Sequence, residues 1–88
     1  MPYMYADKTE RIQFIADEEI LDQIVDWFGK DIVIQDTGNG KIRVNVESSM
    51  LAMENWALQY LNHVEIEKPK KLRDMIITDL KSAMEKYK

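Results

Sequence analysis

The chain has 88 residues, of which 45% are hydrophobic and 32% charged, a composition typical of one globular domain and not of a disordered segment. It contains no cysteine, which excludes disulfides, thiolate metal sites and cysteine nucleophiles. No apolar run is long enough to cross a membrane, and the N-terminus lacks the basic and apolar segments of a secretory signal. We therefore expect a cytoplasmic protein without a membrane partner.

The net charge of −4 is distributed unevenly along the chain. Residues 1–67 carry 13 acidic and 5 basic side chains, giving −8, whereas residues 68–88 carry 3 acidic and 7 basic ones, giving +4. This asymmetry makes a basic C-terminal segment available to the acidic body or to an anionic partner, although a solvated face of lysines is the simpler interpretation. An acidic domain is a poor non-specific binder of nucleic acid.

Residues 1–7 show no period and are predicted to form a tail or the lead-in to a strand, so that the domain proper spans residues 8–88. Between Lys8 and Ala16 apolar and polar residues alternate, which predicts a strand with Ile12 and Phe14 on its buried face.

A helix is predicted to follow, with Asp17 as its N-cap and Gly29 as its C-cap. Its apolar residues recur at helical spacing, and we expect its Trp27 to pack in the core. These residues are Ile20, Leu21, Ile24, Val25, Trp27 and Phe28.

Two further strands, Asp31–Gln35 and Lys41–Glu47, are separated by a turn rich in glycine and asparagine, which predicts an antiparallel hairpin. In the second strand Ile42, Val44 and Val46 are expected to face the core. The spacing of Gly38 and Gly40 matches no phosphate-binding loop, because a strand follows them instead of a helix.

Ser48 or Ser49 can cap the next helix, which ends near Asn62 as a predicted C-cap and carries a stripe of Met53, Trp56, Ala57 and Tyr60. A short strand, Val64–Glu67, comes next. Pro69 suits the first turn of a last helix that runs to about Tyr87. The stripe of this helix contains Leu72, Ile76, Leu80, Ala83, Met84 and Tyr87.

The predicted order is strand, helix, strand, strand, helix, strand and an added helix. This is the split βαβ pattern of an α+β, ferredoxin-like fold, in which two helices cover one face of a four-stranded antiparallel sheet and leave the other open.

Polar side chains of the first and third strands would share that open face, and we identify them as a candidate surface for a ligand or partner. They are Arg11, Gln13, Lys41, Arg43 and Asn45. Because these strands are neighbours in the ferredoxin-like order, Arg11 and Arg43 are expected to lie close together, as paired guanidiniums that recognise carboxylate or phosphate. Ile15 and Val33 would add apolar surface there, which indicates a covered face or an ordinary mixed surface.

A second candidate is a subunit contact through Leu51 and Leu58, one heptad apart outside the main stripe of their helix. We predict no metal site, no cofactor and no catalysis. His63 is the only histidine and is expected in a surface loop, while the acidic residues from Asp17 to Asp26 are expected to be solvated.

The stretch from Trp56 to Arg73 resembles the C-terminal extension that follows the WYL domain in bacterial helix-turn-helix transcriptional regulators. The matching residues are Trp56, Leu58, Tyr60, Val64, Glu65, Ile66, Pro69, Leu72 and Arg73. The chain departs from the family at Leu61, where a glycine is usual. Residues 1–88 contain neither a WYL domain nor a helix-turn-helix, so the resemblance implies a fragment of a longer regulator or a stand-alone copy.

The resemblance implies a non-catalytic module that supports dimerisation and the response to a ligand, often proposed to be nucleic acid. Its expected partners are a second copy or the WYL and helix-turn-helix domains of the parent protein. No ligand residue is carried over from the family, because no position matches. The alternative is a stand-alone ferredoxin-like domain that binds a small anionic ligand at a dimer interface.

Overall fold

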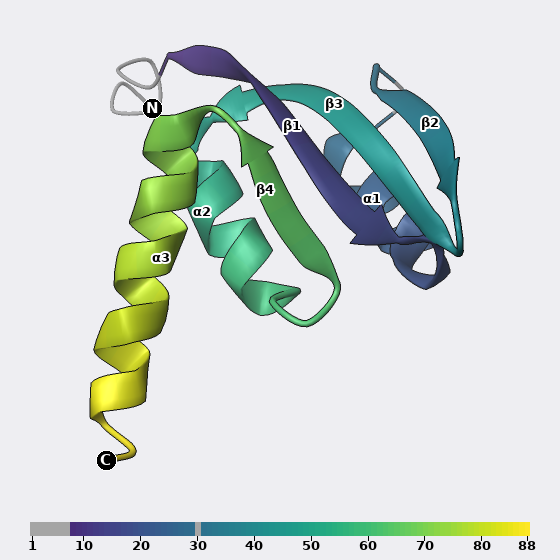
Figure 1. Ribbon diagram of the computed structural model, residues 1–88. Helices are drawn as coiled ribbons and strands as arrows, with labels where there is room; N and C mark the ends of the chain where they lie inside the picture. Colours follow the sequence, from purple (N-terminus) through teal and green to yellow (C-terminus); the bar gives the residue numbers. More distant parts are fainter. Residues whose placement is uncertain (1–7, 30) are drawn as a thin grey trace.

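The computed structural model describes residues 8–29 and 31–88 (Figure 1). The tail or lead-in predicted for residues 1–7 lies outside the described residues. In chain order the elements are β1 (Thr9–Asp17), the short 3-10 helix η2 (Glu18–Ile20), α1 (Leu21–Phe28), β2 (Val33–Gly38), β3 (Lys41–Ser49), α2 (Met50–Gln59), β4 (Val64–Lys68) and α3 (Lys70–Glu85).

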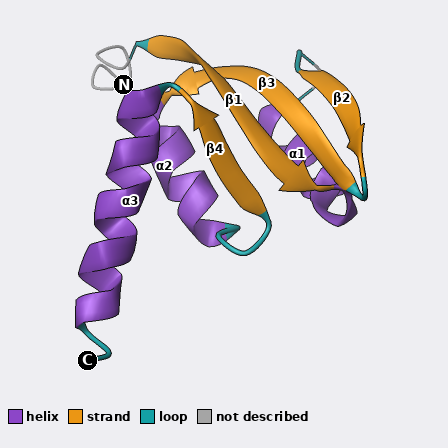
Figure 2. Ribbon diagram, in the orientation of Figure 1, coloured by secondary structure: helices purple, strands orange, loops and turns teal. Residues whose placement is uncertain are grey.

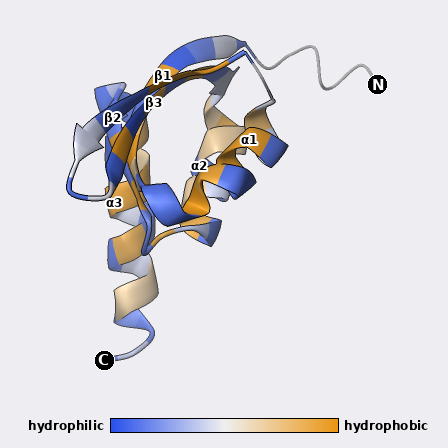
Figure 3. Ribbon diagram, turned by 90° about the vertical axis from the view of Figure 1, so that its right-hand side faces the viewer, coloured by the Kyte–Doolittle hydropathy of each residue, from blue (hydrophilic) through white to orange (hydrophobic). Residues whose placement is uncertain are grey.

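The four strands form one sheet in the order β2-β3-β1-β4, in which all neighbours are antiparallel (Figure 2). Helices α1 and α2 lie on the same side of this sheet, which arches over them in Figure 3. The predicted ferredoxin-like α+β architecture with an added C-terminal helix is therefore confirmed. None of the described helices is long and apolar enough to cross a membrane.

The core lies between the sheet and the two helices. Every second residue of the central strands is buried, as the alternation predicted, with Phe14 and Val44 fully enclosed. Trp56 of α2 is 1% exposed, and its ring lies 5.3 Å from that of Phe14 and 4.9 Å from that of Phe28, centroid to centroid. These aromatic contacts join α1, α2 and β1 across the core.

The prediction that Trp27 packs in the core is wrong, because its side chain is 57% exposed. Helix α1 has only eight residues and turns Ile24 and Phe28 toward the sheet. Successive helical residues are rotated by about 100°, so Trp27 points away from Phe28. A two-turn helix has room for one narrow apolar stripe, and Trp27 lies beside it.

The predicted helix caps have mixed outcomes. The Oγ atom of Ser49 accepts a hydrogen bond from the amide of Ala52 at 3.1 Å, which confirms Ser49 as the N-cap of α2. Asp17 precedes the helical segment but makes no capping bond, because its carboxylate binds Lys41 and His63 instead. Asn62 is not the C-cap of α2, since the helix ends earlier, at Gln59, with Tyr60 in that position.

Helix α3 extends beyond the rest of the domain (Figure 1). Leu72 is buried and Ile76 and Leu80 are partly buried, whereas every residue from Lys81 onward is exposed. The helix ends at Glu85, two residues before the predicted end at Tyr87. The apolar stripe predicted for this helix thus continues past the core that it covers.

Replacing Phe14 with alanine is expected to cost about 3–5 kcal/mol in the free energy of unfolding, because it leaves a cavity between the sheet, Phe28 and Trp56. The control is Trp27→Ala, for which we expect a change within roughly 0.5 kcal/mol, since the side chain is exposed. Urea unfolding followed by circular dichroism measures both. Equal losses for the two variants would contradict the described core.

Candidate interaction surfaces

The five candidate residues of the sheet all lie on its open face. In the register of β1 with β3, Gln13 lies opposite Asn45 and Asp17 opposite Lys41. The alternate residues of both strands are buried against the helices, which leaves this set on the other side. Their role in binding a ligand or partner remains a prediction.

The expected pairing of Arg11 with Arg43 is wrong. Arg11 lies opposite Glu47 of β3, whereas Arg43 lies opposite Ile15 of β1. The two arginines are therefore four residues apart along the ladder, or about 13 Å at roughly 3.3 Å per residue. Alternation shows which face a side chain occupies, but it does not give the register between two strands, and the register separates these guanidiniums.

Arg43 is instead part of a polar network that crosses β1. Its Nε donates to Oε1 of Glu67 on β4 at 3.0 Å, and the side-chain amide of Gln13 donates to the same oxygen at 2.7 Å. The hydrogen bond from Arg43 is the main reason why the pKa of Glu67 lies below its ordinary value. The guanidinium of Arg43 is thus already engaged by a carboxylate of the domain.

A second network, at the far end of the sheet, contains Asp17, Lys41 and His63. Lys41 Nζ binds Oδ1 of Asp17, and His63 Nδ1 lies 2.9 Å from Oδ2. The pKa of Asp17 is lowered, first by the hydrogen bond from Lys41 and then by that from His63. Asp17 also donates its backbone amide to the carbonyl of His63 at 2.9 Å, so the network ties β1 to β3 and to the turn before β4.

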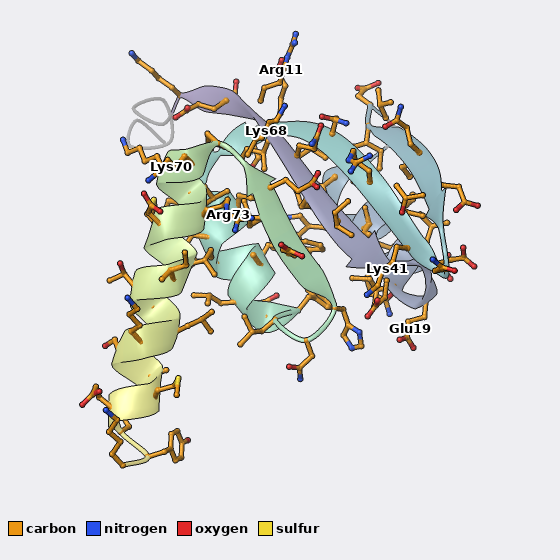
Figure 4. The ribbon with its side chains drawn as sticks, viewed as in Figure 1. Arg11, Glu19, Lys41, Lys68, Lys70 and Arg73 are labelled. Atoms are coloured by element: carbon orange, nitrogen blue, oxygen red, sulfur yellow. The ribbon has the colours of Figure 1, made fainter. Side chains whose placement is uncertain are left out.

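Glu19 lies beside this second network, near Lys41 in Figure 4. Asp17, Glu19 and His63 present one ligand atom each within 4.8 Å of one another, an arrangement that also occurs without a bound ion. Lys41 already supplies a positive charge to Asp17. The contacts of His63 therefore support a structural role, in which its hydrogen bond to Asp17 helps to fix the α2–β4 turn.

Arg11 lies at the opposite end of the sheet from Lys41 and Glu19, and Lys68 lies near it in Figure 4. Within residues 8–29 and 31–88, Arg11 makes no ion pair within 4.0 Å. It lines a shallow hollow together with Val33, Asn45 and two acidic residues, Asp31 and Glu47. Of the five candidate residues, Arg11 is the cation that the domain leaves most available.

An apolar groove of about 200 Å³ lies between the end of α2, β4 and α3. Arg73 borders it and donates from its guanidinium to the carbonyl of Ile66 at 2.7 Å. Its apolar lining is Ala57, Leu61, Val64, Ile66, Ile76, Ile77 and Leu80. Sequence reasoning missed this groove, for which the available signals were Leu61 in place of a helix-ending glycine and Ile77 beside the predicted stripe.

The two residues of the predicted subunit contact, Leu51 and Leu58, differ in their exposure. Leu51 is 56% exposed, whereas Leu58 is partly buried. Their joint role in a subunit contact remains a prediction.

Helices α2 and α3 meet at a pair of carboxyl groups, Glu54 and Asp79. Asp79 Oδ2 is buried and has no hydrogen-bond partner among the described residues. A proton on Glu54 turns it into a donor to Asp79, and this hydrogen bond, followed by burial, raises the pKa of Glu54 above its ordinary value. The contact is therefore stronger in acid than in base.

Replacing Glu54 with glutamine is expected to stabilise the domain at neutral and higher pH. Because the pKa of Glu54 is raised in the folded state, its contribution is present below the unfolded pKa and is lost as the pH rises through the folded pKa. A glutamine donates at every pH. Urea unfolding from pH 4 to 8 measures the effect, with the exposed Glu10→Gln as control. Parallel pH profiles for wild type and Glu54→Gln would contradict this account.

A comparison with protein families places residues 8–84 in the WCX domain family. A search of curated proteins finds no match. The family match covers β1 to the last turn of α3, the same elements that form the sheet, the core and the groove. The chain therefore belongs to the WCX family, the C-terminal extension of WYL-domain regulators, and is a WYL-associated regulatory domain.

Proposed function

We propose that this domain is a non-catalytic, cytoplasmic module of a WYL-type helix-turn-helix transcriptional regulator, where it joins subunits and contributes to the response to a ligand. The observation that carries this proposal is the uncovered apolar stripe of α3. Met84, in the last turn of α3, is 65% exposed, and Tyr87, in the turn that follows the helix, is 90% exposed. A helix end of this kind gains little stability by itself, so it is suited to packing against a partner.

The polar networks of the open face support a binding role in preference to catalysis. The single histidine is hydrogen-bonded to Asp17, and Glu67 is engaged by both Arg43 and Gln13. These groups are held by one another, whereas general acid–base chemistry needs a group poised to exchange a proton with a substrate. A rigid polar face of this kind can instead form the rim of a protein contact.

The distribution of charge supports a nucleic-acid response through the full-length protein. Arg11 and Lys68 lie at the same end of the domain as Lys70, at the start of α3 (Figure 4). Residues 1–67 remain strongly acidic, so these few cations would act together with other domains of the regulator. The alternative, a small anion at a dimer interface, has less support because Arg43 and Lys41 are already ion-paired.

Multi-angle light scattering of the domain and of the parent regulator, over a range of concentrations, tests the subunit contact. We expect a concentration-dependent dimer that Met84→Glu weakens at least tenfold, or about 1.4 kcal/mol, because the substitution places a charge in the stripe. Ser82→Glu adds the same charge on the opposite side of α3 and is expected to have little effect. Circular dichroism checks that both variants remain folded.

A monomer at every concentration, for the domain and for the regulator alike, would refute a role in joining subunits. The ligand response is tested separately by oligonucleotide binding to the regulator at increasing salt. We expect affinity to fall steeply with salt concentration, as counterion release requires. Salt-independent binding would favour a metabolite ligand.

A further inference from the structure

We infer that the partner of the α3 stripe is the α3 helix of a second copy, packed antiparallel about a two-fold axis near residue 82. This inference rests on the proposed role in joining subunits and specifies the surface that does it. Three observations carry it: the spacing of the apolar residues at the C-terminal end of α3 and just after it, the order of the charges there and the position of the groove.

The apolar series at the end of α3, in which Leu80 is partly buried, is symmetric about its own midpoint. Ile77, Leu80 and Met84 follow one another at intervals of three and four residues and lie within roughly 60° of the circumference of α3. Tyr87 continues the series three residues later, in the turn after the helix, where its amide donates to the carbonyl of Met84 at 3.0 Å. In an antiparallel pair centred on residue 82, Ile77 of one copy lies level with Tyr87 of the other, and Leu80 lies level with Met84. An isologous contact requires such self-complementarity, because each residue then meets its counterpart twice.

The charges beside the stripe would also face opposite charges in a second, antiparallel copy. Asp74, Lys81 and Glu85 lie along one flank of α3, and Lys88 follows three residues beyond its end, so that the signs alternate. An antiparallel pair places Lys88 near Asp74 of the second copy and Glu85 near Lys81 of the second copy. Lys88 now lies 2.9 Å from Glu85 of its own chain and Asp74 lies 2.7 Å from Lys70, in exposed pairs that are weakly held and can rearrange.

The groove lies where the second helix would end. Ile77 and Leu80 line it together with Leu61 and Val64. In the antiparallel arrangement, Tyr87 of the second copy reaches the level of Ile77, on the side of the stripe that faces the groove. A nearly fully exposed tyrosine and an apolar groove would thus cover each other, as an aromatic anchor fills a pocket at the centre of many interfaces.

The arrangement also leaves room for both domains. The first half of α3 packs on β4 and α2, while the second half extends away from the sheet (Figure 1). With helices crossing near residue 82, the two sheets lie at opposite ends of the helix pair. The contact therefore needs no rearrangement of the core.

Cross-linking tests the register directly, because the chain has no cysteine of its own. Leu80→Cys chains carrying a mass tag are mixed with untagged Met84→Cys chains and oxidised. We expect a disulfide-linked mixed dimer as the main product, since these positions oppose each other. Ser82→Cys is the matched control and should not link to itself, because its thiols would lie roughly 13 Å or more apart.

A charge exchange provides a second test of the antiparallel register. Lys88→Glu should weaken the dimer several-fold, and adding Asp74→Lys to the same chain should restore it, as light scattering would show. A dimer without the Leu80–Met84 link, or without rescue by the second substitution, would overturn the antiparallel helix pair and leave the role in joining subunits standing. A monomer under all conditions would refute both the antiparallel helix pair and the role in joining subunits.

Discussion

The packing of Phe14 against Trp56 is the contact on which the rest of the domain depends. Phe14 lies on β1, which is hydrogen-bonded to β3 on one side and to β4 on the other. Trp56 comes from α2, and Phe28 brings α1 to the same point. One strand and one aromatic cluster therefore fix the positions of both helices and of three strands, and β2 is held as an edge through β3 alone.

Because the core takes one face of the sheet, the other face has to satisfy its polar groups without help from the helices. It does so by linking strands: Glu67 on β4 reaches Gln13 on β1 and Arg43 on β3, and Asp17 joins Lys41 to the turn that contains His63. These bonds cross β1 in the same direction as the backbone ladders. They pair the charges of Glu67, Arg43, Asp17 and Lys41 within the domain.

Much of the fold could be predicted from sequence because its signals are local. Alternation in Lys41–Glu47 and the glycine turn before it fix a hairpin, and the stripe containing Met53 and Trp56 fixes the inner face of α2. What escaped prediction depends on distances between segments. The separation of Arg11 from Arg43 follows from a strand register, and the engagement of Asp17 by Lys41 follows from the pairing of β1 with β3.

Prediction also failed where an element is shorter than its pattern suggests. Trp27 has the spacing of a core residue, but α1 is too short to bury a second side of its circumference. The opposite holds for α3, whose apolar pattern is longer than the core that it meets. The groove between α2, β4 and α3 combines residues from three segments, and no single stretch of sequence contains its outline.

The way α3 is attached has a mechanical consequence. Only its first half is held against the domain, by buried Leu72 and by the hydrogen bond from Arg73 to the backbone of Ile66, so the helix can tilt about a point beside β4. The distance from Leu72 to Glu85 is about 20 Å at 1.5 Å per residue. A tilt of a few degrees about that point would move the C-terminal end of the helix by an ångström or more. Small adjustments near α2 and β4 are thereby converted into a larger displacement wherever the tip is held.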